Sequence, residues 1–228
     1  MKIDLFVIAS GPSLTEEDCR LIANTGVPIL AVNDSWQRTP RCNFLFAGDI
    51  KWWDAHAEEV PAKIQKFTSA KKAAMKHGIN FFPANGAFNS GMRALMWALH
   101  TGFKNIVLLG FDCSIKKDIH WHGPHSKALG LSNPDKIMMR RWLIHFLDVY
   151  ARAGRLEANI INCSRHTELK CFKCLTLEEV LGIKKVEKKE VTKEKHDKVV
   201  EVDLEHGAFR KAIIIKNKKK KENEKKEK

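Results

Sequence analysis

The sequence I-D-L-F-V-I-A-S-G-P-S-L, at residues 3–14, gives the clearest indication of the fold. Residues 3–9 form a short apolar run rich in Ile, Val and Phe, and the S-G-P-S segment that follows interrupts regular structure. A short apolar run bounded in this way is typical of a buried strand. Ser13, with Glu16 three residues later, fits a capping box, which predicts a helix directly after this strand.

The same alternation of strand and helix continues along the chain. Further strands are predicted at residues 28–32, 43–47, 79–82, 105–109 and 158–162. The clearest helix opens at an N-S-G segment and covers residues 89–101, and two more are predicted at residues 134–153 and 176–181. This order predicts an α/β fold with a doubly wound, mostly parallel, Rossmann-like sheet.

A long polar segment interrupts the pattern at residues 114–133. It contains three histidines and shows no helical or strand periodicity. Segments of this length without regular structure are typically functional loops or lids. We therefore expect a lid-like loop here.

The composition changes after Gly182, where Lys, Glu and Val become dominant. We predict a Rossmann-like nucleotide-binding transferase domain at residues 1–182 and a basic extension at residues 183–228. The extension carries 17 basic and 10 acidic residues, which accounts for +7 of the formal net charge of +13. Residues 199–204 and 208–215 fit a hairpin, and the Lys-rich end is expected to be a disordered tail.

Charge and cysteine content limit the functional classes. A basic body suits an anionic ligand, and the Lys-rich tail suits nucleic acid or another anionic surface. No run of about 18 apolar residues is present, which excludes a membrane span. Six cysteines without a secretion signal favour a cytoplasmic protein with reduced thiols. The C-x2-H-x4-C-x2-C spacing of Cys163, His166, Cys171 and Cys174 leaves a zinc site open.

Polar residues follow the predicted central strands. Ligands of doubly wound sheets bind at the carboxyl ends of the strands, so these residues are expected to share one rim. The free N–H groups at the start of the helix at residues 89–101 favour phosphate at the same rim. Each residue taken alone also fits a turn or a helix cap. The predicted nucleotide-binding residues are Gly11, Pro12, Ser13, Asn33, Asp34, Asn89, Ser90, Gly91 and Asp112.

Two further features point to chemistry at this rim. Asp49 follows the third predicted strand and can bind a ribose, ligate a metal or cap a turn. Trp52 and Trp53 come just after it and fit either stacking on a base or packing in the core. The sequence H-W-H-G-P-H-S at residues 120–126 concentrates imidazoles, which can take a proton from an attacking hydroxyl or hold zinc.

These motifs together resemble those of bacterial CMP-sialic-acid-dependent sialyltransferases. The resemblance rests on G-P-S-L after the first strand, N-S-G, L-L-G-F-D at residues 108–112, and H-S at residues 125–126. It spans residues 3–172. It implies a CMP-sugar donor and a histidine general base at His125, with His122 as the alternative, because Pro124 adds one residue to the family's H-x-x-G-H-S segment.

Asp49, in the segment F-A-G-D, has no counterpart in that family. It is similar to an aspartate of the motility accessory factor and 6-hydroxymethylpterin diphosphokinase group, which also shows G-P-S-L and L-G-x-D. That resemblance implies diphosphate transfer from ATP with magnesium, for which Asp49 and Asp112 would supply the ligands.

Three functions follow from the sequence. The leading prediction is a transferase: a nucleotide-sugar-dependent, sialyltransferase-like glycosyltransferase with catalytic residues among His125, His122 and Asp49, and no required metal or other cofactor. The first alternative is a magnesium- and ATP-dependent diphosphokinase-like transferase. The second is a noncatalytic accessory protein that binds a nucleotide or nucleic acid.

Overall fold

The computed structural model describes residues 2–84, 86, 88–116, 118–125, 130, 131 and 133–183 of the 228-residue chain. The predicted hairpin and Lys-rich tail of the extension lie outside the described residues. So does Ser126, the last residue of the histidine segment.

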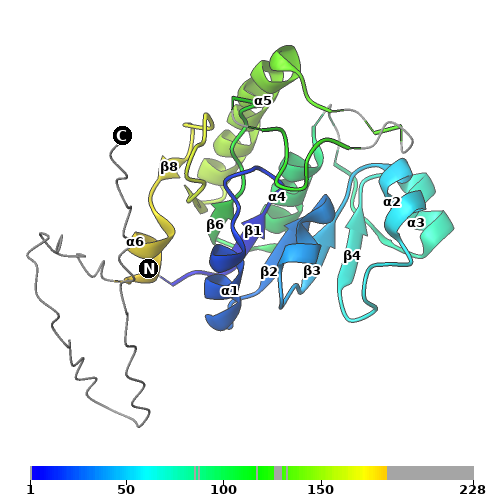
Figure 1. Cartoon of the computed structure of the whole chain (residues 1–228), viewed down its shortest axis with the longest axis horizontal. Coiled ribbons are helices and arrows are strands. Elements are labelled where there is room, and N and C mark those ends of the chain that lie inside the picture. The colour runs from blue at the N-terminus through cyan, green and yellow to red at the C-terminus, as the bar shows by residue number, and fades with distance from the viewer. Residues whose placement is uncertain are drawn as a thin grey trace, which may run out of the picture. The chain divides into compact units, whose positions relative to one another are not determined.

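Eight strands of the described chain form one sheet (Figure 1). Their order is β5-β4-β3-β2-β1-β6-β7-β8, and every pairing between neighbours is parallel. This confirms the α/β, Rossmann-like fold, and the sheet is parallel throughout rather than mostly parallel. The strands are β1 (Leu5–Ile8), β2 (Ile29–Val32), β3 (Phe44–Phe46), β4 (Gln65–Thr68), β5 (Asn80–Phe81), β6 (Asn105–Leu109), β7 (Asn159–Asn162) and β8 (Lys173–Cys174).

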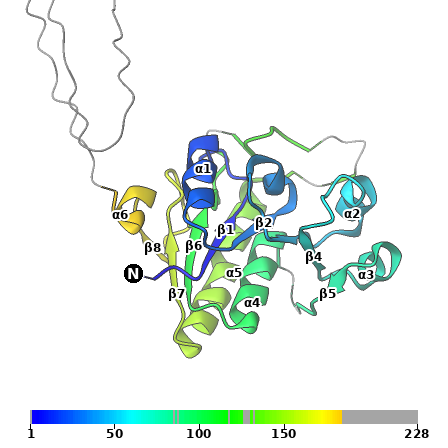
Figure 2. The same cartoon turned by 90° about the horizontal axis from the view of Figure 1, so that it is seen from below.

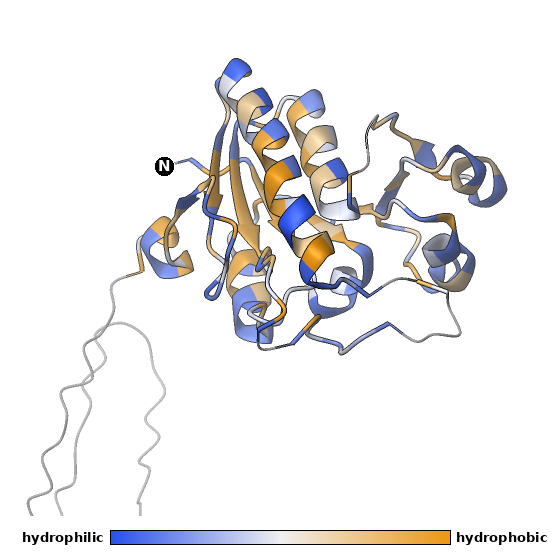
Figure 3. Cartoon of the chain, turned by 90° about the horizontal axis from the view of Figure 1, so that it is seen from above, coloured by the Kyte–Doolittle hydropathy of each residue, from blue (hydrophilic) through white to orange (hydrophobic). Residues whose placement is uncertain are grey.

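Helices cover both faces of this sheet, as Figure 2 shows with α4 and α5 side by side on one face and α1 on the other. The helices are α1 (Glu16–Asn24), α2 (Ile50–His56), α3 (Lys71–His77), α4 (Ser90–Thr101), α5 (Lys136–Arg155) and α6 (Leu177–Leu181), with a 3-10 helix, η1 (Asn33–Arg38), directly after β2. A parallel sheet buried on both faces requires apolar side chains in both directions. In Figure 3 the central strands are accordingly coloured as hydrophobic, while the helices carry both kinds of residue.

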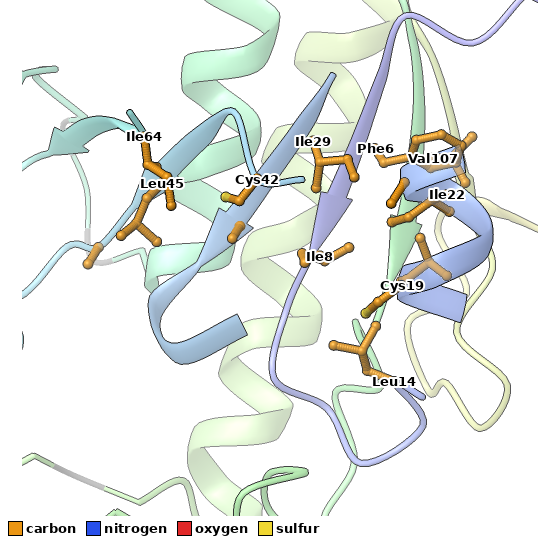
Figure 4. Packing of buried hydrophobic residues seen from close by; sticks show 14 of the residues in the cluster. Phe6, Ile8, Leu14, Cys19, Ile22, Ile29, Cys42, Leu45, Ile64 and Val107 are labelled. Atoms are coloured by element: carbon orange, nitrogen blue, oxygen red, sulfur yellow. The ribbon is translucent and has the colours of Figure 1, made fainter. Parts of the chain in front are cut away.

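The alternation of side chains along β1 divides the core into two layers. Leu5 and Val7 pack with residues of α4 and α5, whereas Phe6 and Ile8 pack with Ile22 of α1 (Figure 4). All four strand residues are fully buried. Because successive strand residues point to opposite faces, one four-residue segment anchors both helical layers.

Several predicted elements are confirmed with small shifts in their ends. The N-S-G helix is α4, which Gly102 ends in a left-handed conformation. The prediction that Ser13 caps α1 is wrong, because the cap is Thr15, whose side chain accepts from the Asp18 backbone N–H. Strand β4, with the sequence Q-K-F-T, was not predicted, since it is too polar to stand out as an apolar run.

The strand order reverses between β1 and β6, and the backbone segments that follow these two strands approach each other closely there. Gly11 N–H donates to Gly110 O at 2.8 Å, and a Cβ on Gly110 would lie 2.2 Å from the carbonyl oxygen of Ala9. Gly110 also has a φ of +68°, which favours glycine. Glycine at this position therefore lets the ends of β1 and β6 approach each other where the crevice of the sheet begins.

Within the described part of the chain, no helix is long and apolar enough to cross a membrane.

We expect Gly110→Ala to destabilise the protein more than Gly26→Ala does. Gly26 is also left-handed, with a φ of +74°, but a Cβ there would meet no atom within 4 Å. The control should lower the free energy of unfolding by about 1–2 kcal/mol, and Gly110→Ala by about 2 kcal/mol more, because backbone must move. Urea unfolding of both variants measures the difference. An equal loss of unfolding free energy in the two variants would show that a Cβ at residue 110 does not disturb the approach of β1 and β6.

Candidate functional site

A two-part cleft lies at the carboxyl ends of the central strands. Its larger part has a volume of about 600 Å³, and its smaller part, at the ends of β1, β2 and β6, about 110 Å³. Five residues line both parts and so join them: Asn33, Asn89, Ser90, His120 and Trp142. This is the position at which doubly wound sheets bind their ligands.

The amino-terminal end of α4 forms one wall of the cleft. Asn89 caps the helix by accepting from the Met92 backbone N–H at 2.8 Å. Ser90 Oγ accepts from the Gly48 N–H at 3.0 Å, which ties this helix end to the loop after β3. The N–H groups of the first helical turn have no partner within the helix, and the dipole of a 12-residue helix adds to their positive potential. This wall is therefore suited to an anion such as phosphate.

Basic side chains outnumber acidic ones around the larger part. Lys51, Arg93 and Arg141 line it, and Asp49 is the one carboxylate among the described residues that do so. Arg93 Nε is buried without a hydrogen-bond partner among the described residues. A guanidinium presents several N–H donors in a fixed plane, which matches phosphate or carboxylate. The charge of this wall therefore favours the same anionic class of ligand as the end of α4.

The histidine segment closes the cleft from the other side and is anchored on the end of β1. Trp121 N–H donates to Ser10 O at 2.9 Å, and Ser10 Oγ lies 2.9 Å from His120 Nδ1. The rings of His120, His122 and His125 have centroids 4.8 to 5.3 Å apart. His120 and His125 line the larger part of the cleft, and His122 does not.

Burial lowers the pKa of all three imidazoles. Desolvation is the main cause in each ring, and it lowers the pKa of His120 to about 4. The pKa values of His122 and His125 are lowered by the same cause, against the opposing charge of Asp34. At neutral pH the three rings are therefore uncharged, and a free imidazole nitrogen can accept a proton or bind a metal.

Asp34 lies beside the histidines and not on the wall of the cleft. Its carboxylate is buried, and its Oδ1 accepts from Trp52 Nε1 at 3.1 Å. Its Oδ2 lies 3.5 Å from His122 Nε2. Asp34 and His122 thus form a pair next to the cleft, and neither lines it.

Asp112 holds the loop after β1. Its Oδ2 accepts from the Ser13 backbone N–H at 2.9 Å, and its Oδ1 accepts from the Ser13 hydroxyl. Both residues are buried. Ser13 and Asp112, both predicted to contact a nucleotide, are thus hydrogen-bonded to each other. Both carboxylate oxygens of Asp112 have a donor within the protein.

The aromatic residues after Asp49 pack in the core. Trp53 is fully buried and its Nε1 donates to Ala47 O at 2.9 Å. Trp52 is 1% exposed and packs edge-on against Trp53. Both rings therefore pack mainly in the core, and only Trp52 also borders the larger part of the cleft, as Asp49 does.

The structure brings most of the predicted site residues together and separates a few. Those on the cleft are Gly11, Asn33, Asp49, Asn89, Ser90, Gly91, Asp112 and His125. Pro12 and Ser13 line a different depression, beside Arg165, into which Asp112 also faces. Asp34 and His122 line neither part of the cleft.

Several residues that line the cleft are not among the predicted site residues, including His120, Arg93 and Arg141. His120 belongs to the quoted histidine segment, where it precedes His122 and His125. Arg93 is two residues after the N-S-G segment, so its position at the start of a helix beside an anion site was a usable signal. Arg141 lies within α5 and has no local motif, so only the packing of α5 beside α4 brings it to the cleft.

The zinc site that the C-x2-H-x4-C-x2-C spacing left open is not formed. Among the described residues, the one group of three His, Cys, Asp or Glu side chains with all ligand atoms within 4.8 Å is Asp34, His122 and His125. Cys163 is buried, Cys174 is exposed, and all six cysteines are free. Desolvation raises the pKa of Cys163 to about 12, which keeps this thiol protonated.

No protein-family model matches this chain, and no curated protein does. Several solved structures show a distant likeness, and two of them are described here. One is a thiamin pyrophosphokinase from Geobacillus thermodenitrificans, with 15% identity and a TM-score of 0.30 over 63% of this chain and 55% of the other. The second is a UDP-glucose 4-epimerase from Brucella ovis in complex with NAD, with 13% identity and a TM-score of 0.31 over 71% and 51%. This chain thus spans about half the length of each, and the likeness assigns no family.

We expect Asp112→Ala to lower the free energy of unfolding and Asp112→Asn to preserve most of it. Alanine leaves the buried Ser13 N–H without an acceptor, which costs about 1–3 kcal/mol. Asparagine can accept from that N–H with its Oδ1 and donate to the Ser13 hydroxyl. Denaturant unfolding compares the two. A loss in Asp112→Asn as large as that in Asp112→Ala would mean that the carboxylate charge, and not the clamp on the loop, stabilises the protein.

Proposed function

We propose that the protein binds a nucleotide-activated donor in the cleft and transfers its activated group to a hydroxyl acceptor. The observation that carries the proposal is that the amino-terminal end of α4, Asn33 and His125 all line the same cleft. The three come from segments far apart in the chain. An anion-binding helix end beside an uncharged imidazole is the pairing that this chemistry needs. The leading candidate donor is a CMP-sugar, which rests on the resemblance to sialyltransferases.

The phosphate of the donor would lie against α4 and the two arginines. The N–H groups of Ser90 and Gly91, with Arg93 and Arg141, can neutralise the charge that grows on the phosphate as it leaves. Donors held in place before the reaction stabilise this charge without a metal. The proposed transfer therefore does not require one.

His125 is the proposed general base. Its backbone is held by Asn133, which accepts from the His125 N–H at 2.7 Å and donates to the His125 carbonyl at 3.1 Å. The ring is half-buried and lines the larger part of the cleft. A fixed, uncharged imidazole at this place can take the proton of an acceptor hydroxyl as the hydroxyl attacks the donor carbon.

The magnesium-dependent alternative receives less support from the geometry. It needs both Asp49 and Asp112 as ligands, but Asp112 already accepts from Ser13 with both oxygens. Asp49 keeps the alternative open to test, because its side chain makes no capping hydrogen bond to α2 and lines the cleft. A noncatalytic nucleotide-binding protein would show binding without turnover.

Nucleotide binding should depend on Arg141 and not on its neighbour Arg140. Both are exposed residues of α5, but only Arg141 lines the cleft. In a thermal-shift panel of CMP, UDP, GDP and ATP, each with magnesium and with EDTA, we expect CMP to raise the midpoint in EDTA as well. Arg141→Met should weaken this binding about 10-fold, as expected for the loss of a charge-assisted hydrogen bond, and Arg140→Met should leave it unchanged. Stabilisation by ATP that requires magnesium would favour the diphosphokinase alternative.

His125→Gln should abolish transfer while it preserves nucleotide binding. Loss of a general base lowers turnover by about 100-fold or more. The measurement is release of CMP from CMP-sugars in the presence of hydroxyl acceptors, together with the CMP-induced thermal shift. His77→Gln is the control, because His77 pairs with Asp54 outside the cleft. Unchanged turnover in His125→Gln would reject this base, and no turnover with any donor in the wild type would favour the noncatalytic alternative.

A further inference from the structure

A buried carboxylate with three imidazoles around it lies next to the proposed transfer site. One of them, His56, has its Nε2 3.9 Å from Asp34 Oδ1, and the other two belong to the histidine segment. Asp34, at the start of η1, is 7% exposed. His122 and His125 come from the loop about 90 residues later, and the ligand atoms of the three side chains all lie within 4.8 Å of one another. The chain thus folds these three side chains onto a common point from two distant segments.

The spacing of His122 and Asp34 is that of two ligands on one metal ion. His122 Nε2 and Asp34 Oδ2 are 3.5 Å apart, which is too long for a good hydrogen bond. Two atoms that each lie about 2.0–2.1 Å from a tetrahedral zinc ion are about 3.4 Å from each other. An ion between the two atoms would therefore fit with little movement.

His122 also lacks the hydrogen bond that would explain its burial. Its Nε2 is buried and has no hydrogen-bond partner among the described residues. Leaving a buried polar nitrogen unpaired is unfavourable. A metal bond to the lone pair of this nitrogen would compensate for that loss.

The carboxylate is oriented as metal ligands usually are. Trp52 Nε1 donates to Asp34 Oδ1 at 3.1 Å, which leaves Oδ2 directed at His122. Outer hydrogen bonds of this kind fix the direction of a ligand and are typical of metal centres. The indole is itself buried in the core, so this orientation is rigid.

We propose that Asp34, His122 and His125 form a binding site for a divalent first-row transition metal such as Zn²⁺. Two imidazoles and one carboxylate suit zinc, cobalt or iron, whereas magnesium prefers oxygen ligands in an octahedron. Three protein ligands leave one position of a tetrahedral ion free for water or another ligand. One of the three, His125, also lines the cleft.

Metal binding has a consequence that rests on the proposed function. If His125 accepts the proton of the acceptor, a metal bound to the same ring nitrogen prevents it from doing so. The protein then cannot hold a metal ion at this site and use His125 as a base at the same time. Zn²⁺ would therefore inhibit the transfer. EDTA should restore the activity.

The first test is a titration of the full chain with Co²⁺, which reports the number and type of ligands through its absorption spectrum. Zn²⁺ is then added to displace the cobalt, and competition with a chromophoric chelator measures the affinity for Zn²⁺. We expect one ion per chain, with cobalt d–d bands that lack the charge transfer of thiolate ligands, and no displacement by excess Mg²⁺. Asp34→Asn and His122→Gln should each weaken Zn²⁺ binding by about 100-fold or more, since loss of even an outer partner costs 10–100-fold. His100→Gln, on the exposed end of α4, is the matched control and should bind as the wild type does.

Three outcomes would overturn the proposal. They are no binding at one equivalent, binding that both variants retain, and a thiolate charge-transfer band, which would assign the ion to cysteines. Circular dichroism of each variant shows whether it is folded, and two variants at different ligands keep the test valid if one of them fails to fold. Since the titration needs no donor or acceptor, it fails or succeeds independently of the proposed transfer, and only the inhibition by Zn²⁺ depends on both.

Discussion

The ends of β1 and β6 approach each other closely, and the position of the cleft follows from this approach. Gly11 donates to Gly110 O, and Gly110 can hold this position because it lacks a Cβ. The strand order reverses at this pair, so the chain leaves β1 in one direction along the sheet and β6 in the other. A cleft opens where the connections diverge. The residues of the candidate site lie around this opening.

Loops at the cleft are held by polar contacts between distant segments. Asp112 after β6 clamps Ser13 after β1, and Ser10 meets His120 of the long loop. Each contact joins residues about 100 positions apart and partly or fully buried. Because a buried polar group without a partner is costly, such contacts favour one loop conformation over others. The end of β1 therefore both borders the cleft and holds the histidine loop beside it.

The electrostatics divide the site into two regions. The end of α4 with Arg93 and Arg141 is positive, whereas the imidazoles beside Asp34 are uncharged because burial lowers their pKa values. The first region suits the phosphate of a donor. The second suits proton transfer or a metal ion, which compete for the same lone pairs. Both proposals thus follow from one arrangement of charge and burial.

Local patterns in the sequence predicted the fold class and many of the polar residues that line the cleft. Periodicity and caps are local signals, so the strand at residues 3–9 and the helix from Asn89 to Gly102 could be read directly. Polar strands such as β4 carry no such signal. Which polar groups meet could not be predicted from such patterns: Ser13 forms hydrogen bonds with Asp112 instead of capping α1, and Asp34 lies beside the histidines instead of on the cleft wall. The partner of a buried polar group depends on the backbone geometry of distant segments, about which local sequence patterns carry no information.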